Sequence, residues 1–271
     1  MAIIGVSGKI GSGKDTVGHI IQYLTEPELQ NASGCQDFLE NGHVMINYPY
    51  TWQIKKFADK LKECISIITG ISREDLEKSE VKNSELGREW DYAKITSKST
   101  FSQKERFSHH SDALSYANSM RKQIAGSDYT ATTFNMTVRQ LLQEFGTEVG
   151  RSIHPNFWIN ALFSEYKGYY SPIHDAVDNA EDAKTFNKVK YPNWIITDMR
   201  FPNELKTVKD RGGITIRCNR GIYPNDSINI QAHPSETALD NATFDYTIDN
   251  SGSIEDLIEK VKEILIKEKI I

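Results

Sequence analysis

The chain has 271 residues, 38% of them hydrophobic, with a formal net charge of -5 and three cysteines. This length suffices for one large α/β domain with insertions, or for two modest ones, and for a full core, and the acidic balance argues against a general nucleic-acid-binding surface. The widely separated cysteines favour neither a zinc site nor a disulfide framework, and no stretch approaches about 18 uninterrupted apolar residues, so we expect a cytoplasmic protein without a membrane segment.

The first predicted element is a short buried strand over 3–6, and a glycine-rich segment follows it. Residues 8–16 read Gly-Lys-Ile-Gly-Ser-Gly-Lys-Asp-Thr, which nearly matches the G-x-x-x-x-G-K-[ST] pattern of a phosphate-binding loop. Glycines let successive N–H groups point at phosphates, and the next helix presents its positive end to them. We therefore predict a phosphate site formed by Gly11, Ser12, Gly13, Lys14, Asp15 and Thr16.

The loop departs from the pattern at one position. Asp15 follows the lysine, and the hydroxyl comes one residue later, at Thr16. In motor ATPases and GTPases a hydroxyl directly after the lysine ligates Mg²⁺, so this chain is not expected to be built like those proteins. The order is similar to the G-K-G-T of many nucleoside monophosphate kinases, which makes Thr16 the candidate Mg²⁺ ligand. A glycine-rich turn that binds nothing is the alternative.

The next segments are predicted in chain order as a polar loop over 25–42, a strand over 44–48 and a helix over 54–68 that ends at Gly70. From 78 to 133 apolar residues thin out. We interpret this stretch as an insertion, helical near 113–124, and as a candidate cover over the active site. The pair His109-His110 within it favours a solvated loop over a metal site.

The pattern then returns to alternating helices and strands. We predict a helix from Val138 that ends at Gly146, a helix after Pro155, a polar loop over 168–192 and a final helix capped by Ser253 and Asp256. Three further strands are expected over 194–197, 214–218 and 246–249, with a helix over 205–210. This alternation predicts an α/β fold, a parallel sheet flanked by helices in a single domain over 1–271.

Ligands of open α/β sheets bind beyond the carboxyl ends of the strands, so the residues after each predicted strand are candidates. Asp198 follows the strand over 194–197, where a carboxylate can hold a water of the Mg²⁺ shell, and Arg200 can reach a phosphate. The alternatives are a helix cap for Asp198 and an ion pair between Glu204 and Arg200. Phosphoryl transfer needs many cations, and the candidates are Lys9, Lys14, Arg139, Arg151, Arg200 and Arg220.

Several segments together resemble the bacteriophage deoxynucleoside monophosphate kinases. They are residues 7–16, 57–62, 139–148, Trp158, 197–200 and 233–236, where the last segment reads His-Pro-Ser-Glu. The similarity is spread over most of the chain and is weakest over 78–133. The phosphate loop alone is specific to a mechanism, and the other segments count by their order and combination.

The resemblance implies a P-loop kinase fold and the reaction ATP + dNMP = ADP + dNDP with Mg²⁺, in support of deoxynucleotide supply for DNA synthesis. It implies that residues 11–16 and Arg220 bind ATP, that Thr16 and Asp198 serve the metal, and that Lys14, Arg139, Asp198 and Arg200 are catalytic. The acceptor nucleotide would be bound by Lys9, Phe57, Ala58, Arg139, Gly146, Thr147, Arg151, Trp158, Asp198, Arg200 and Glu204. Core packing is the alternative for Phe57 and Trp158, and a local hydrogen bond is the alternative for His233 and Glu236.

Two other functions stay open at this point. Another small-molecule P-loop kinase, of the dephospho-coenzyme A or phosphomevalonate type, would share the loop and the sheet. A regulatory NTP-binding switch would use the loop without any phosphoryl acceptor. The expected partners are the small molecules ATP and dNMP, without nucleic acid or membrane. The accepted bases, the preference for deoxyribose and the choice between monomer and homodimer are left open.

Overall fold

The structure of the protein, a computed structural model, divides the chain into two compact units. One unit comprises Met1–Asp59 and Pro155–Ile271, and the other comprises Lys60–His154. The predicted single domain with an insertion over 78–133 stays a prediction, and that insertion falls within the second unit. The structure describes residues 2–27, 29, 34–41, 50–97, 102–106, 109–125, 129–169, 189–221 and 237–271.

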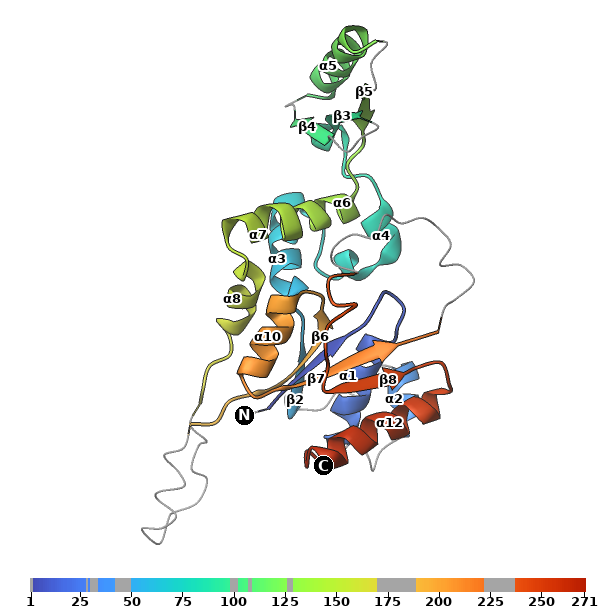
Figure 1. The fold of residues 1–271 in the computed structure, drawn as a ribbon, viewed down its shortest axis with the longest axis vertical. Coiled ribbons are helices and arrows are strands. Elements are labelled where there is room, and N and C mark those ends of the chain that lie inside the picture. The colour runs from blue at the N-terminus through green and yellow to red at the C-terminus, as the bar shows by residue number, and fades with distance from the viewer. Residues whose placement is uncertain are drawn as a thin grey trace. The chain divides into compact units, whose positions relative to one another are not determined.

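The first unit is built on a five-stranded sheet with the order β2-β6-β1-β7-β8. Every neighbouring pair is parallel, as the alternation of strands and helices predicts. The first strand of the chain, β1, lies in the middle, and the strands that follow it flank it on both sides (Figure 1). The strands are β1 (Ile3–Ser7), β2 (Trp52–Lys55), β6 (Asn193–Met199), β7 (Ile214–Asn219) and β8 (Tyr246–Asp249).

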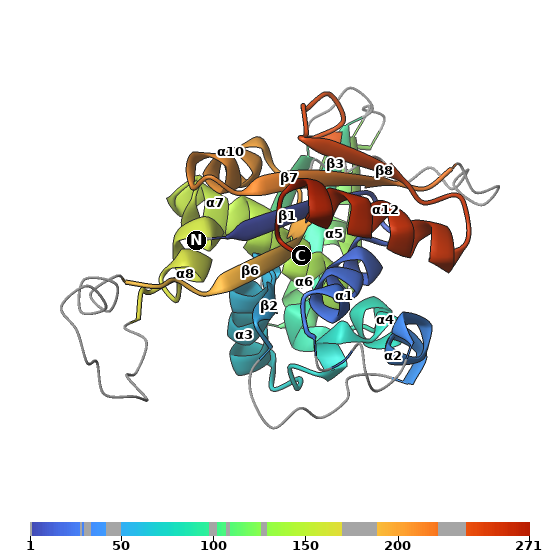
Figure 2. The ribbon, with the colours of Figure 1, turned by 90° about the horizontal axis from the view of Figure 1, so that it is seen from below.

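Helices cover both faces of this sheet. Helices α1 and α12 lie side by side on one face, with α2 next to α1, while α8 and α10 pack on the other face (Figure 2). The predicted caps of α12 are confirmed, since Ser253 and Asp256 form a capping box. The helices are α1 (Lys14–Leu24), α2 (Cys35–Asn41), α8 (Phe157–Phe163), α10 (Pro202–Asp210) and α12 (Ile254–Lys267).

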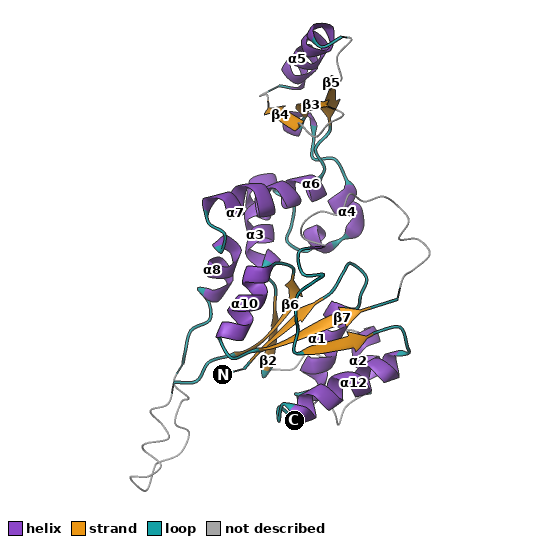
Figure 3. Ribbon diagram, in the orientation of Figure 1, coloured by secondary structure: helices purple, strands orange, loops and turns teal. Residues whose placement is uncertain are grey.

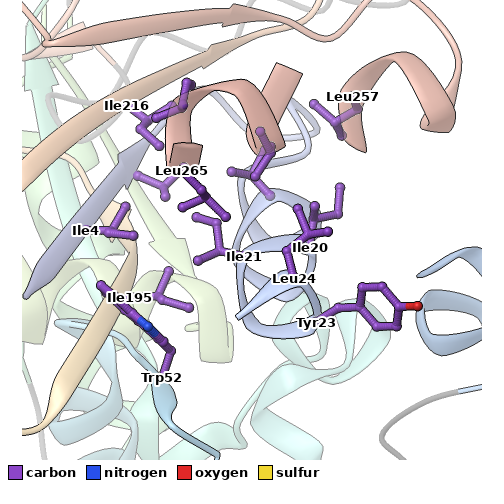
Figure 4. Close-up of a cluster of buried hydrophobic side chains, with 14 of the residues drawn as sticks. Ile4, Ile20, Ile21, Tyr23, Leu24, Trp52, Ile195, Ile216, Leu257 and Leu265 are labelled. Carbon is purple, nitrogen blue, oxygen red and sulfur yellow. The ribbon is translucent and has the colours of Figure 1, made fainter. Parts of the chain in front are cut away.

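The two hydrophobic cores of this unit follow from the alternation of side chains along the strands. Ile4 of β1 is buried under α1 and α12, whereas its neighbour Ile3 is buried on the face of α8 and α10. Figure 4 shows Ile21 of α1 pointing toward Ile4 and Ile195 of the sheet. A parallel sheet covered on both faces needs apolar residues throughout its strands, which explains the continuous apolar runs in the sequence.

Helix α3 (Ala58–Thr69) differs from its prediction at one end. The sequence pattern placed its start at Ile54, and this is wrong, because Ile54 lies in β2 and pairs with Ile195 of β6. The apolar residue at 54 fits the helical period by coincidence and is used by the sheet. The predicted end is confirmed, since Gly70 has a φ of 73°, a left-handed conformation that terminates helices.

The second unit contains an antiparallel sheet that the sequence did not reveal. Its strands have the order β4-β3-β5, and β3 and β5 pack against α5 (Figure 3). The helix predicted near 113–124 is confirmed as part of α5, whereas the sequence predicted none of the three strands. These strands carry many polar residues and lack the apolar runs of a sheet covered on both faces. They are β3 (Tyr92–Ser97), β4 (Ser102–Arg106) and β5 (Tyr129–Phe134), with α5 at His110–Gln123.

The helix predicted to end at Gly146 continues through it. α6 (Val138–Gln143) runs into a π-helical turn (Glu144–Val149) and then into α7 (Gly150–Ile153). The glycine serves packing here, because a Cβ at Gly146 would lie 2.7 Å from Leu61 Cδ2. Glycine at this point is therefore a site of close approach to α3 and not a helix terminator.

Shorter elements complete the second unit, namely two 3₁₀ turns (Asp75–Glu77 and Arg88–Trp90) and α4 (Ser79–Asn83). The loop predicted over 25–42 contains the seven-residue helix α2. The predicted strand over 44–48 and most of the polar loop predicted over 168–192 lie outside the described residues. Within the described ranges, no helix combines the length and the apolar content needed to cross a membrane.

Candidate phosphate-binding site

The carboxyl ends of the five parallel strands meet at one edge of the first unit's sheet. The glycine-rich loop follows β1, and a polar or charged residue follows each of the other strands within one or two positions. These residues are Lys56 after β2, Arg200 after β6, Arg220 after β7 and Asn250 after β8. Such an edge is where open α/β sheets bind their ligands.

The loop between β1 and α1 turns through two backbone conformations that only glycine adopts easily. Gly11 and Gly13 have φ values of 76° and 90°. The Ser12 N–H donates to Lys9 O at 3.1 Å, which closes the turn. The first N–H groups of α1 have no acceptor within the helix, so the loop and the helix start together offer amide donors and a positive helix end to an anion.

Positive side chains surround this loop. Lys14 Nζ lies 3.4 Å from Lys9 O, so the lysine folds along the loop, and Arg220 Nη1 lies 3.5 Å from Gly11 O. Lys9 is exposed and pairs with Asp240 at 3.5 Å. The structure thus places Lys9, Lys14 and Arg220 at the loop, and their charges suit a polyphosphate, while the role of each toward a nucleotide stays a prediction.

Asp15, the residue that departs from the sequence pattern, links α1 to two strands. Its Oδ1 accepts a hydrogen bond from Thr197 Oγ1 at 2.8 Å and pairs with Lys56 Nζ at 2.9 Å. Burial raises the pKa of Asp15, but the bonds and charge of Lys56, the Thr197 hydroxyl and Lys14 outweigh it and lower the pKa below its usual value. Asp15 is therefore a carboxylate that fixes the start of α1 against the ends of β2 and β6.

Asp198 is a buried carboxylate at the end of β6. Its two oxygens accept the backbone N–H groups of Phe57 and Ala58 at 2.8 and 2.9 Å, at the start of α3. Burial raises the pKa of Asp198, opposed by these two bonds and by the nearby charge of Arg200. The alternative considered from the sequence, a cap of the helix that follows Asp198, is wrong, because the carboxylate accepts the N–H groups at the start of α3 and not those of α10. A catalytic or Mg²⁺ role for Asp198 stays a prediction.

Glu204 and Arg200 are joined through the backbone. Glu204 is 1% exposed, and its Oε2 accepts the N–H groups of Arg200 and Phe201 at 2.7 and 3.0 Å. The glutamate therefore shapes the turn that presents Arg200 beyond the sheet. The proposed contact of Glu204 with an acceptor stays a prediction, and so does that of Arg200.

The aromatic candidates of this unit are buried. Phe57 is 3% exposed and packs against Phe163 with ring centroids 6.4 Å apart. Trp158 is also 3% exposed and meets Phe157 edge-on. Both side chains thus contribute to packing, the alternative that the sequence left open, and stacking on a base stays a prediction for each.

Four predicted acceptor residues belong to the second unit. Arg139, in α6, donates from Nε to Asn83 Oδ1 at 2.9 Å. Gly146 and Thr147 lie in the π-helical turn, and Arg151 lies in α7. Their roles toward a nucleotide stay predictions, and His233 and Glu236 lie outside the described residues.

The residues around the loop fit a phosphate better than a metal held by the protein alone. Thr16, the predicted Mg²⁺ ligand, lies in the first turn of α1. Among the described residues, no group of three or more His, Cys, Asp or Glu side chains is arranged to hold a metal ion. A divalent cation at this site would therefore take most of its ligands from phosphate oxygens and water, as Mg²⁺ commonly does.

Three residues of this edge were missed from the sequence. Lys56 was hidden because Ile54 of β2 fits a helical pattern, and Asn250 directly follows the strand predicted over 246–249, which is confirmed as β8. Arg217 lies inside β7 and donates to Ser7 Oγ and Asp240 Oδ1, each at 3.0 Å. The signal that marks Asn250 is its place directly after the strand predicted over 246–249, whereas no such signal marks Lys56, because its strand was not predicted.

Comparison with known proteins agrees with this geometry. The model of the deoxynucleotide monophosphate kinase family matches residues 2–261. A protein of Acanthamoeba polyphaga mimivirus named "Putative deoxynucleotide monophosphate kinase" is 27% identical over 134 residues, which cover 47% of this chain and 61% of that relative. Because the family model spans nearly the whole chain, the protein belongs to the deoxynucleotide monophosphate kinase family, a family of phosphotransferases.

Proposed function

We propose that the protein transfers the γ-phosphoryl group of ATP to a deoxynucleoside 5′-monophosphate and releases ADP and a deoxynucleoside diphosphate. Family membership supports the kinase class and the acceptor class. The observation that carries the choice of a nucleoside triphosphate as donor is the loop behind β1. Its two left-handed glycines precede Lys14 at the start of α1, the arrangement that cradles the phosphates of nucleotides.

The protein's work in such a reaction is positioning and charge neutralisation. An oxygen of the acceptor phosphate attacks the γ-phosphorus in line, and the bond to the bridging oxygen of ADP breaks, so no side-chain nucleophile is needed. Lys14, Arg200 and Arg220 would stabilise the negative charge on the transferred group. Mg²⁺, when bound, supplies further neutralisation of the phosphates, and Thr16 and Asp198 are the residues that would hold it or its waters.

An assay of ADP release with and without each deoxynucleoside monophosphate tests this proposal. We expect release to depend on the acceptor, and Lys14→Ala to lower turnover by roughly 100-fold or more, the usual loss when a donor to transition-state charge is removed. Lys206→Ala is a matched control. Lys206 is an exposed lysine of α10 paired with Asp210, and its removal should leave turnover unchanged.

Two results would contradict the proposal. ADP release that is slow and indifferent to every monophosphate would indicate an NTP-binding switch. Normal turnover in a folded Lys14→Ala protein would show that the loop behind β1 does not hold the reacting phosphates.

A further inference from the structure

The carbonyl of Ser12, in the middle of the phosphate loop, is held by two side chains from distant parts of the chain. Cys218 donates its S–H to Ser12 O at 2.9 Å, and Asn250 donates from Nδ2 to the same oxygen at 2.9 Å. Cys218 lies near the end of β7, and Asn250 is the first residue after β8. One backbone oxygen thus receives two donors from the two strands on the same side of β1.

Both donors are themselves fixed. Cys218 is 0% exposed, and burial raises the pKa of its thiol to about 11, against the opposing charges of Lys14 and Arg220. The sulfur therefore keeps its proton at neutral pH and remains a donor. The backbone N–H of Asn250 donates to Asn219 O at 2.6 Å, which anchors the residue beside the end of β7.

Glycine at two positions of the loop, Gly8 and Gly13, leaves room for these donors. A Cβ at Gly13 would lie 2.3 Å from Asn250 Nδ2, and a Cβ at Gly8 would lie 2.6 Å from Cys218 O. Any side chain at either position would push the loop away from β7 or displace the amide of Asn250. The absence of side chains at Gly8 and Gly13 is thus matched to the approach of β7 and Asn250.

The held carbonyl determines where the next N–H group points. The peptide bond between Ser12 and Gly13 is trans, as are all peptide bonds of the described chain, so its C=O and N–H point in opposite directions. With the Ser12 oxygen drawn toward Cys218 and Asn250, the Gly13 N–H is directed to the other side of the loop. If this peptide turned over, a carbonyl oxygen would face the anion in place of an amide donor.

We propose that Cys218 and Asn250 are positioning residues that hold the Ser12–Gly13 peptide in the orientation that binds phosphate. The inference rests on the proposed function, since it assigns these residues to the nucleotide phosphates. Neither side chain needs to touch the nucleotide. They act through the Ser12 carbonyl, and their removal should weaken binding of the phosphate donor while acceptor binding is retained.

Titration of ADP into the full-length protein and its variants, followed by calorimetry, tests the proposal. Asn250→Ala and Cys218→Ala each remove one donor and should raise the Kd for ADP by roughly tenfold, the change that one hydrogen bond of ordinary net strength implies. Asn250→Asp keeps the size of the side chain but turns a carboxylate oxygen toward the carbonyl, so its loss should be larger. Cys218→Ser keeps a donor and should bind ADP close to normally.

Two further measurements separate positioning from a general loss of structure. Thr215→Val removes a buried hydroxyl of the same strand that donates to Asp245 Oδ2 at 2.6 Å. It should lower the thermal midpoint without changing the Kd for ADP. The KM for the monophosphate should also stay within about twofold in the Asn250 and Cys218 variants, which is under 0.5 kcal/mol.

The outcomes are distinguishable. If the unaltered protein binds ADP and the folded Asn250→Ala and Cys218→Ala variants bind it equally well, the positioning role is overturned and the proposed kinase function stands. If Thr215→Val weakens ADP binding as much as they do, the effect is one of general stability and the inference is overturned. If the unaltered protein does not bind ADP, the proposed function itself fails.

Discussion

Replacing Gly13 by alanine should lower the free energy of unfolding and weaken phosphate binding, because the new Cβ atom would both strain the backbone and clash with Asn250. Gly13 has a φ of 90°, a left-handed conformation that costs an L-residue about 1–2 kcal/mol. The new Cβ would lie 2.3 Å from Asn250 Nδ2, so the amide must move and its bond to Ser12 O is lost. Loss of that bond costs about 1 kcal/mol more, so the free energy of unfolding should fall by about 2–3 kcal/mol in total.

Gly212→Ala is a matched control for the backbone cost alone. Gly212 has a φ of 69°, and a Cβ there would meet no atom of the described residues within 4 Å. It lies before β7, at the amino end of the strand, whereas the phosphate loop lies at the carboxyl end. We therefore expect a loss of about 1–2 kcal/mol and an unchanged affinity for ADP.

Urea unfolding followed by circular dichroism measures the two stability losses, and calorimetric titration measures ADP binding. Gly13→Ala should lose more stability than Gly212→Ala and should bind ADP at least tenfold more weakly, a change of about 1.4 kcal/mol. Equal losses of stability in the two variants, or normal ADP affinity in Gly13→Ala, would refute this reasoning.

Three further predictions concern the carboxylates. Asp198→Ala leaves the N–H groups that begin α3 without their acceptors and should lower the free energy of unfolding by about 2–4 kcal/mol; a loss below about 0.5 kcal/mol in urea unfolding would contradict the capping role. Lys56→Met removes the main partner that lowers the pKa of Asp15, so the Asp15 carboxyl should titrate at higher pH by NMR, and an unchanged titration would count against the ion pair. Burial raises the pKa of Glu77, but bonds from Lys62 and Arg73 bring it down to about 2. The stability from these bonds is therefore complete above the unfolded pKa of about 4.5 and is lost as the pH falls toward 2. The stability advantage of the unaltered protein over Glu77→Gln should shrink between pH 5 and pH 2, and a constant advantage would disprove the contribution of these bonds.

The parts of the fold that the sequence predicts well are those with a local physical cause. The loop over 8–16 is recognised because glycines, lysine and a following amphipathic helix stand at fixed spacing. Helix α12 is recognised because Ser253 and Asp256 cap an apolar stripe. In each case the residues that determine the structure are close together in the chain.

The parts that the sequence does not predict depend on partners far away in the chain. Ile54 fits a helical period, and its pairing with Ile195 decides that it belongs to a strand. Glycine at position 146 is typical of a helix end, but the helix continues there, and glycine is needed because Leu61 lies too close for a side chain. The strands of the second unit are too polar to be recognised as strands from the sequence. They form a sheet of three strands, and two of them, β3 and β5, pack against α5.

The candidate site divides in the same way. Lys14 and the loop amides follow from the motif, whereas the bonds of Asp198 to Phe57 and Ala58 join residues 140 or more positions apart. The attachment of Ser12 to Cys218 and Asn250 spans more than 200 positions. The sequence proposes candidate residues for the chemistry, and the sheet determines which partners their side chains contact.

A crystal structure with ADP and a deoxynucleoside monophosphate bound tests the central claim most directly. We predict that the β-phosphate of ADP accepts hydrogen bonds from the amides of Gly13 and Lys14, with the Lys14 ammonium beside it. A nucleotide found elsewhere, or a loop whose amides face away from its phosphates, would contradict the claim that the segment between β1 and α1 is the phosphate site.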